Sequence, residues 1–204
     1  MPRYPLPMSS ASLRFLLRPI CFASVAATLA AVGCSSATPP NPRVYLQSQI
    51  DDGTNPPPGC GIVASSNGWV DIGSVNQSID NGGSQTGGPV TVSCSVTSNG
   101  DGSFQVNAAA TVGGAAGGSV TIVGKFTSSG MQSGITAHFQ RGDGSGSFQE
   151  TDCTASYATN ANMGVAAGRI WAQLECPTVI DNEKTTPLVC EGKAEFRFED
   201  CSGS

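Results

Sequence analysis

The chain has 204 residues, with 15 acidic side chains against 10 basic ones and a formal net charge of −5 at pH 7. This acidity excludes nucleic acid as an expected partner, because neutralising phosphates requires clustered lysine and arginine. His138 is the only histidine and no two cysteines have Cys-x-x-Cys spacing, which excludes the usual zinc and copper sites, so no metal or cofactor is predicted.

Residues 1–33 have the pattern of a secretory signal. They carry three arginines and no acid, and a short apolar run ends in small residues. A basic start, a short apolar core and small residues before a cut are typical of export, and the apolar run is shorter than the roughly 20 residues that span a bilayer. We therefore expect residues 1–33 to be cleaved.

The segment "LAAVGC", which ends at Cys34, resembles the lipobox of bacterial lipoproteins. The resemblance covers this segment alone, and Ala31 stands where the family more often has leucine. It implies that Cys34 carries a lipid and is the first mature residue, with residues 34–43 as a Pro-rich tether. Ser35 is not the aspartate that retains such proteins in the inner membrane. The resemblance therefore implies an exported protein whose lipid binds the membrane, in the outer membrane or at the cell surface.

Six cysteines remain once Cys21 leaves with the signal and Cys34 takes the lipid. An even number in an exported chain predicts three disulfides. The six are Cys60, Cys94, Cys153, Cys176, Cys190 and Cys201. Cys176 and Cys190 flank a polar loop and form the preferred pair, while the other pairings stay open. The mature chain keeps seven basic and fifteen acidic residues, a net charge of about −8.

Residues 44–204 are predicted to form a single β domain. Residues 44–50 suit a first strand or an extended arm, while residues 51–61 and 81–89 are rich in proline and glycine and predict loops. From residue 90 onward, apolar and polar residues alternate in short runs separated by Gly-rich turns. The side chains predicted to face inward are Val90, Val92, Cys94, Val96, Phe104, Val106, Ala108, Ala110, Val112, Val120, Ile122, Phe126, Ile135, Ala137, Phe139, Cys153, Ala155, Tyr157, Ile170, Ala172, Leu174, Cys176, Phe196 and Phe198.

About seven or eight short strands separated by such turns predict an all-β fold, and we expect a disulfide-braced antiparallel β-sandwich or a jelly-roll-like fold. The stretch "GRIWAQLECP…CEGKAEFRFEDC" resembles the closing strands of uncharacterised secreted bacterial lipoproteins. This second resemblance covers roughly residues 150–201 and implies no activity.

No catalytic residue is predicted. His138 would have to serve any Ser-His-Asp triad, but alternation places it on the polar face of a strand, so we interpret it as an exposed strand histidine. Carboxylate pairs are the other route to hydrolysis, and Glu150 with Asp152 and Glu195 with Glu199 share strand faces. A spacing of two along a strand, about 6–7 Å, lies within the range of a glycosidase pair. A solvated strand face explains both pairs without catalysis.

Binding is predicted at exposed aromatic side chains. Trp171 points to the polar face of its strand beside Arg169, and Trp69 lies in a short polar segment. An aromatic ring among polar neighbours suits a sugar platform or a partner hot spot. The segments "RGD" (141–143) and "DGSGSFQE" (143–150) match an adhesion tripeptide and the start of a calcium loop, and we interpret both as hairpin turns.

Two functional hypotheses follow from the sequence. The first is a non-enzymatic, lipid-anchored envelope lipoprotein with a binding or structural role, whose partner is an envelope protein or a glycan. The alternative is a carboxylate-based hydrolase that acts on envelope or extracellular polysaccharide, with Glu150, Asp152, Glu195 and Glu199 as candidates.

Overall fold

A computed structural model describes residues 41–52, 60, 62, 68–159, 161–181 and 183–203. They belong to one compact unit, residues 38–204. The predicted signal, Cys34 and the first part of the tether lie outside the described residues. In the described part of the chain, no helix is long and apolar enough to cross a membrane.

The described residues contain strands, turns and loops but no helix, as the sequence predicts. Eight strands are long: β1 Arg43–Asp51, β5 Gly88–Ser98, β6 Ser103–Val112, β7 Gly118–Thr127, β8 Gln132–Arg141, β9 Ser147–Ser156, β11 Arg169–Asp181 and β12 Leu188–Glu199. Four are short: β2 Asp71–Ile72, β3 Ile79–Asp80, β4 Ser84–Gln85 and β10 Gly164–Ala166. The long strands include every run of alternating residues noted above, and the sequence signal missed the four short ones because two or three residues show no period.

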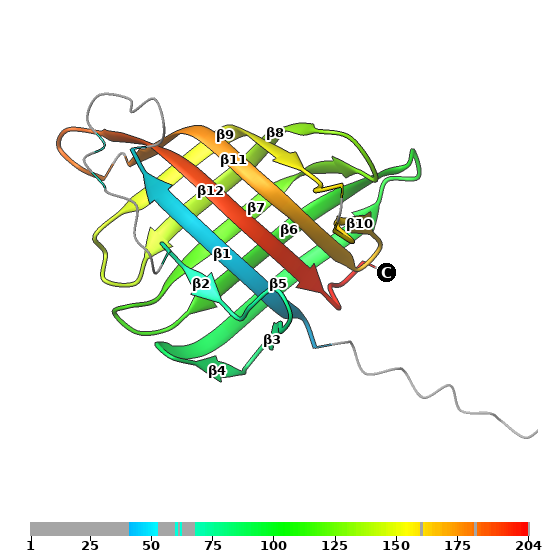
Figure 1. The fold of residues 1–204 in the computed structure, drawn as a ribbon, viewed down its shortest axis with the longest axis horizontal. Coiled ribbons are helices and arrows are strands. Elements are labelled where there is room, and N and C mark those ends of the chain that lie inside the picture. Colours follow the sequence, from blue (N-terminus) through cyan, green and yellow to red (C-terminus); the bar gives the residue numbers. More distant parts are fainter. Residues whose placement is uncertain are drawn as a thin grey trace, which may run out of the picture. The chain divides into compact units, whose positions relative to one another are not determined.

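The strands form one nearly closed, barrel-like antiparallel sheet rather than two stacked sheets. Its order is β2-β1-β12-β11-β9-β8-β7-β6-β5-β4, with β10 on β11 and β3 on β1. Figure 1 shows β1, β12 and β11 in front and β5, β6 and β7 behind them. The prediction of a sandwich or jelly roll is therefore wrong, as is the count of seven or eight strands. Alternation reports only that one face of each strand is buried, and this holds equally for a sandwich and for a rolled sheet.

The short strands β3 and β4 and the turn between them occupy part of the seam where the sheet would otherwise stay open. β3 pairs with β1, β4 pairs with β5, and the turn between them joins the same two strands. In that turn Gly82 donates to the Val90 carbonyl at 2.9 Å, and Asn81 donates to the Pro42 carbonyl at 2.8 Å. Farther along the seam, Ser202 pairs with β5 and completes the ring near the C-terminus. Few backbone groups of β1 and β5 are thus left as an open sheet edge.

The interior is filled by the predicted inward side chains. Phe126, Phe139 and the phenylalanines of β12 are fully buried, while Phe104 and Tyr157 are only partly buried near strand ends. A Cβ on Gly192 would lie 2.9 Å from a Val179 methyl, and one on Gly124 would lie 2.5 Å from Ile135 Cδ1. Each glycine thus makes room for a neighbouring core side chain.

Three disulfides join the six predicted cysteines, which is typical of an oxidising compartment outside the cytoplasm. The pairs are Cys60–Cys190, Cys94–Cys201 and Cys153–Cys176. The predicted pairing of Cys176 with Cys190 is wrong. β11 and β12 continue into the segment interpreted as a loop, and their register sets Cys176 opposite Gly192 and Cys190 opposite Val179.

Candidate functional site

The outer face of β1, β12 and β11 carries four of the side chains that the sequence singles out: Arg169, Trp171, Glu195 and Glu199. These three strands lie side by side at the front of Figure 1, and their pairing arranges the outward side chains in rows. The rows are Tyr45–Arg197–Trp171, Gln47–Glu195–Gln173 and Gln49–Lys193–Glu175. Directly opposed side chains have Cβ atoms about 4.5–5.5 Å apart, so the members of a row lie within contact distance. We call this surface the β1–β12–β11 face.

Arg197 lies between two aromatic rings at the centre of the first row. Its guanidinium carbon is 5.9 Å from the centroid of the Tyr45 ring and 5.1 Å from that of Trp171, within the range of cation–π attraction. The same guanidinium donates to the Ser78 hydroxyl at 2.9 and 3.2 Å and forms an ion pair with Glu199 at 3.3 Å. Tyr45 is buried beneath this arrangement, and burial raises the pKa of its hydroxyl. Arg197 is thereby fixed in position and charge-compensated.

Glu195 connects the second row to the first. Its Oε1 accepts a hydrogen bond from the Trp171 indole nitrogen at 3.3 Å, and its Oε2 accepts one from the Gln173 amide nitrogen at 3.5 Å. Trp171 remains partly exposed, as the sequence predicts for a side chain on the polar face. A ring held on one side by Arg197 and at its edge by Glu195 is ordered before any ligand arrives, which lowers the entropic cost of binding.

A cavity of about 230 Å³ opens beside the Trp171 ring, and we call it the Trp171 cavity. Arg169, Arg197 and Glu199 line it together with Trp171, and Met163 and Val165 supply apolar wall from the side of β10. Gly164 is the cross-strand partner of Trp171, and a Cβ built on that glycine would meet no atom within 4 Å. The structure therefore brings Trp171 and Arg169 to one cavity and leaves open space beside the ring.

A second cavity of about 260 Å³ lies over β1, β2 and β12, and two carboxylates line it. Asp71 on β2 pairs with Gln47, and Gln47 pairs with Glu195, so the two acids stand two strands apart, about 10 Å between backbones. Burial raises the pKa of Asp71, although its Oδ1 accepts a hydrogen bond from the Ser48 amide. Asp71 therefore keeps its proton to a higher pH than an exposed aspartate.

Trp69 does not belong to the β1–β12–β11 face, which corrects its prediction as a second exposed aromatic. Its side chain is 8% exposed and packs edge-to-face against Phe148, with ring centroids 5.5 Å apart. The guanidinium of Arg141 lies 4.9 Å from the centroid of the Trp69 ring and donates to the Trp69 carbonyl. The "RGD" segment is a turn, as predicted, and its arginine is engaged in holding Trp69 against the core.

Glu150 and Asp152 do not form a carboxylate pair by simple alternation. Ala137 lies opposite Glu150 and Ile135 lies opposite Cys153, so Thr151 and Asp152 together face one residue of β8. This extra residue is a β-bulge, which interrupts the period of two. The prediction that Glu150 and Asp152 share a strand face is therefore wrong.

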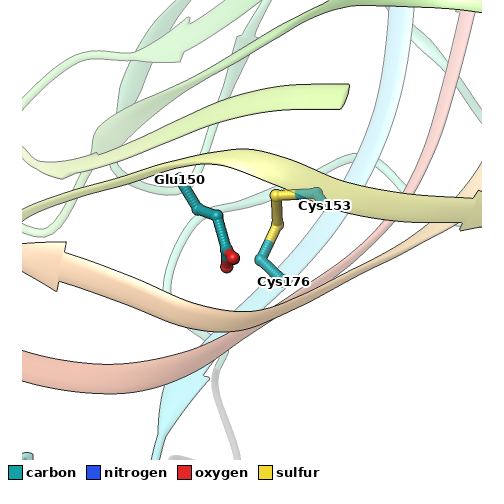
Figure 2. A group of neighbouring side chains, drawn as sticks. All are labelled: Glu150, Cys153 and Cys176. Carbon is teal, nitrogen blue, oxygen red and sulfur yellow. A yellow bond between two sulfur atoms is a disulfide. The ribbon is translucent and has the colours of Figure 1, made fainter. Parts of the chain in front are cut away.

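Figure 2 shows the Glu150 carboxylate beside the disulfide between Cys153 and Cys176. Their oxygen and sulfur atoms lie within 4.8 Å of one another, the single such trio in the described part of the chain. The two sulfurs are bonded to each other, so neither offers the thiolate that a metal requires. Glu150 Oε2 instead accepts a hydrogen bond from the Thr178 amide at 2.8 Å. This satisfies a backbone group of β11 in the stretch where β9 and β11 are not paired with each other.

His138 contacts a serine but does not complete a triad. Its Nε2 lies 2.9 Å from the Ser147 hydroxyl. The nearest carboxylate partner of this serine, Asp181, accepts from the Ser147 backbone amide at 3.4 Å rather than from the imidazole. A triad requires the acid to orient the histidine, and no described carboxylate does so. None of the cavities named above includes His138.

Sequence reasoning missed Tyr45 and Asp71 as members of this surface. Tyr45 lies in a segment whose role as strand or arm was open, and β2, which carries Asp71, has only two residues. Arg197 was not singled out either. Their roles depend on the adjacency of β1 with β12, which are separated by most of the chain.

No family model, curated protein or solved structure matches this chain.

Proposed function

We propose that this chain is a non-enzymatic, lipid-anchored envelope lipoprotein whose β1–β12–β11 face binds a glycan. The observation that carries the proposal is the partly exposed Trp171 ring beside its cavity, with hydrogen-bonding groups in the adjacent rows. Sugars present flat apolar faces rimmed by hydroxyls, and a ring bordered by amides and carboxylates complements both features. The alternative hypothesis for this surface is that the same ring binds a protein partner.

Replacing Trp171 by alanine is expected to weaken glycan binding by about tenfold or more, because stacking on an aromatic ring contributes of the order of 1–2 kcal/mol. The full chain, purified in detergent, would be titrated by calorimetry with solubilised peptidoglycan fragments, a neutral β-glucan and polygalacturonate. Trp171→Phe keeps a ring and should retain most of the affinity. Met131→Ala, at a side chain that is 75% exposed, is the matched surface control and should change nothing.

Unchanged affinity in Trp171→Ala, for every glycan that the parent binds, would refute the assignment of the site. Circular dichroism and a thermal melt of each variant separate lost binding from lost folding. If none of the three glycans binds the parent, the glycan proposal fails, and the face would then be assigned to a protein partner.

A carboxylate-based hydrolase remains the alternative, now centred on Asp71 and Glu195 rather than on Glu150 and Asp152. Both acids line one cavity, and burial raises the pKa of Asp71, as a general acid requires. The same polysaccharides, assayed for new reducing ends, test it. Turnover by the parent that is lost in Asp71→Asn or Glu195→Gln would replace the binding proposal, whereas binding without turnover supports that proposal.

The membrane anchor is the second part of the proposal and rests on the lipobox resemblance and on the disulfides, which are typical of an exported chain. Mass spectrometry of the mature N-terminus should find acylated Cys34, and Cys34→Ser should move the protein from the membrane fraction to the soluble one. Cys21→Ser is the matched control and should leave fractionation unchanged, because Cys21 is expected to leave with the signal. An unmodified Cys34 in the mature protein would contradict the anchor.

A further inference from the structure

We infer that the Trp171 cavity is a subsite for a sugar that carries a carboxylate, such as a uronic acid. The inference rests on the proposed function and adds the chemical class of the ligand. Its central residue is Arg169, which is exposed at the start of β11 and whose side chain has no hydrogen bond, ion pair or ring contact with any described residue.

Arg169 differs in this respect from the other cations of the same face. Arg43 contacts Asp80 at 3.5 Å, Lys193 contacts Glu191 at 2.8 Å, and Arg197 is compensated by Glu199. In a chain with a marked excess of acids, a guanidinium left without a carboxylate at the wall of a cavity is an available binding group. Arginine presents a planar pair of donors that matches a carboxylate in a bidentate manner.

The charge of the cavity wall favours a ligand with a single negative charge. Arg169 and Arg197 contribute two positive charges and Glu199 contributes one negative charge, which leaves one positive charge uncompensated. A carboxylate matches that balance, whereas a phosphate with two charges would bring its second charge close to Glu199. The volume of about 230 Å³ lies below the roughly 300–1,000 Å³ of drug-sized sites, so one sugar ring is the expected occupant.

The positions of Arg169 and Trp171 suit such a ring. The two residues are two positions apart on one strand, so their side chains leave the same face about 6–7 Å apart. A pyranose stacked on the indole, on the open side next to Gly164, would direct a C6 carboxylate toward the guanidinium over about that distance. Met163 and Val165 would cover the remaining apolar edge of the sugar.

The test compares oligogalacturonate with its methyl ester, because esterification removes the negative charge at C6 and adds only a methyl group. Calorimetric titration of the full chain should show the acid binding about tenfold or more tightly than the ester, the range expected for a charge-assisted hydrogen bond. Arg169→Gln should remove that preference by weakening the acid to about the affinity of the ester. Trp171→Ala should weaken both ligands. Lys184→Gln removes a positive charge from an exposed loop residue outside the cavity and should leave the preference intact.

The outcomes distinguish a failure of the carboxylate subsite from a failure of glycan binding as a whole. Equal binding of acid and ester, or an unchanged preference in Arg169→Gln, would overturn the carboxylate subsite and leave glycan binding in place. Failure of acid, ester, neutral glycan and peptidoglycan fragments alike to bind would overturn the proposed function itself. Dextran sulfate distinguishes the source of the charge: binding that is as tight as that of the uronate and equally sensitive to Arg169→Gln would replace the carboxylate with a sulfate and so contradict the inference.

Discussion

Loss of the Cys94–Cys201 disulfide is expected to lower the free energy of unfolding by about 5 kcal/mol. The two cysteines are 107 residues apart in the chain, and a cross-link between such distant residues removes a large loop-closure entropy from the unfolded state. The same bridge holds the C-terminal segment against β5, where Ser202 closes the end of the seam. Urea unfolding of the Cys94→Ala/Cys201→Ala double variant, followed by circular dichroism, measures the difference.

The Cys153–Cys176 bridge provides the matched control. It spans 23 residues, so Cys153→Ala/Cys176→Ala is expected to cost about 3 kcal/mol by the same entropic reasoning. It also joins strands that pair directly on either side of it, whereas Cys94–Cys201 joins a strand to a terminal segment. If removing the Cys153–Cys176 bridge lowered the free energy of unfolding more than removing Cys94–Cys201, this order would be contradicted. Native contacts, rather than loop closure, would then determine the effect.

Replacement of Phe139 by alanine is expected to lower the free energy of unfolding by about 3–5 kcal/mol. The ring is fully buried, and it projects from β8 toward β12, where a Cβ on Gly192 would lie 3.2 Å from Phe139 Cε2. Truncation therefore leaves a cavity in the middle of the sheet interior, which the surrounding strands cannot collapse to fill. Thermal and urea unfolding of the single variant test the value.

Phe104→Ala is the comparison for this change, because it deletes the same side chain near a strand end. Phe104 is only partly buried and packs against the edge of the core, so its loss should cost clearly less than that of Phe139. Similar decreases in the free energy of unfolding for the two variants would mean that the side chains around Phe139 relax into the space left by its ring, so the interior is not tightly packed there.

The strand interiors could be predicted from the sequence because their alternation is strong. The predicted inward residues of β5, β6, β7, β8 and β11 are buried, with exceptions only near strand ends such as Phe104. The predicted export signal and the cysteine count likewise indicated an oxidising compartment, and three disulfides are present. These inferences used only information within one strand or one segment.

The candidate site could be predicted only in part. Trp171 was placed on a polar face by alternation, and Arg169 next to it by the same period. Trp69 was misplaced because a loop residue has no period to show which way it points. The pairing of Glu150 with Asp152 failed because a single bulged residue in β9, invisible in the sequence, shifts the alternation.

By itself, the sequence determined that the described chain is all β, which side chains of β5, β6, β7, β8 and β11 are buried, and that six cysteines form three bridges. Only the tertiary structure decided that the strands roll into one nearly closed sheet, which cysteines are joined, and that Tyr45, Arg197 and Trp171 form one row. The physical reason is the range of each interaction. Burial and alternation act along one strand, whereas strand order, register and disulfide pairing join different strands, at separations of up to 130 residues for a disulfide.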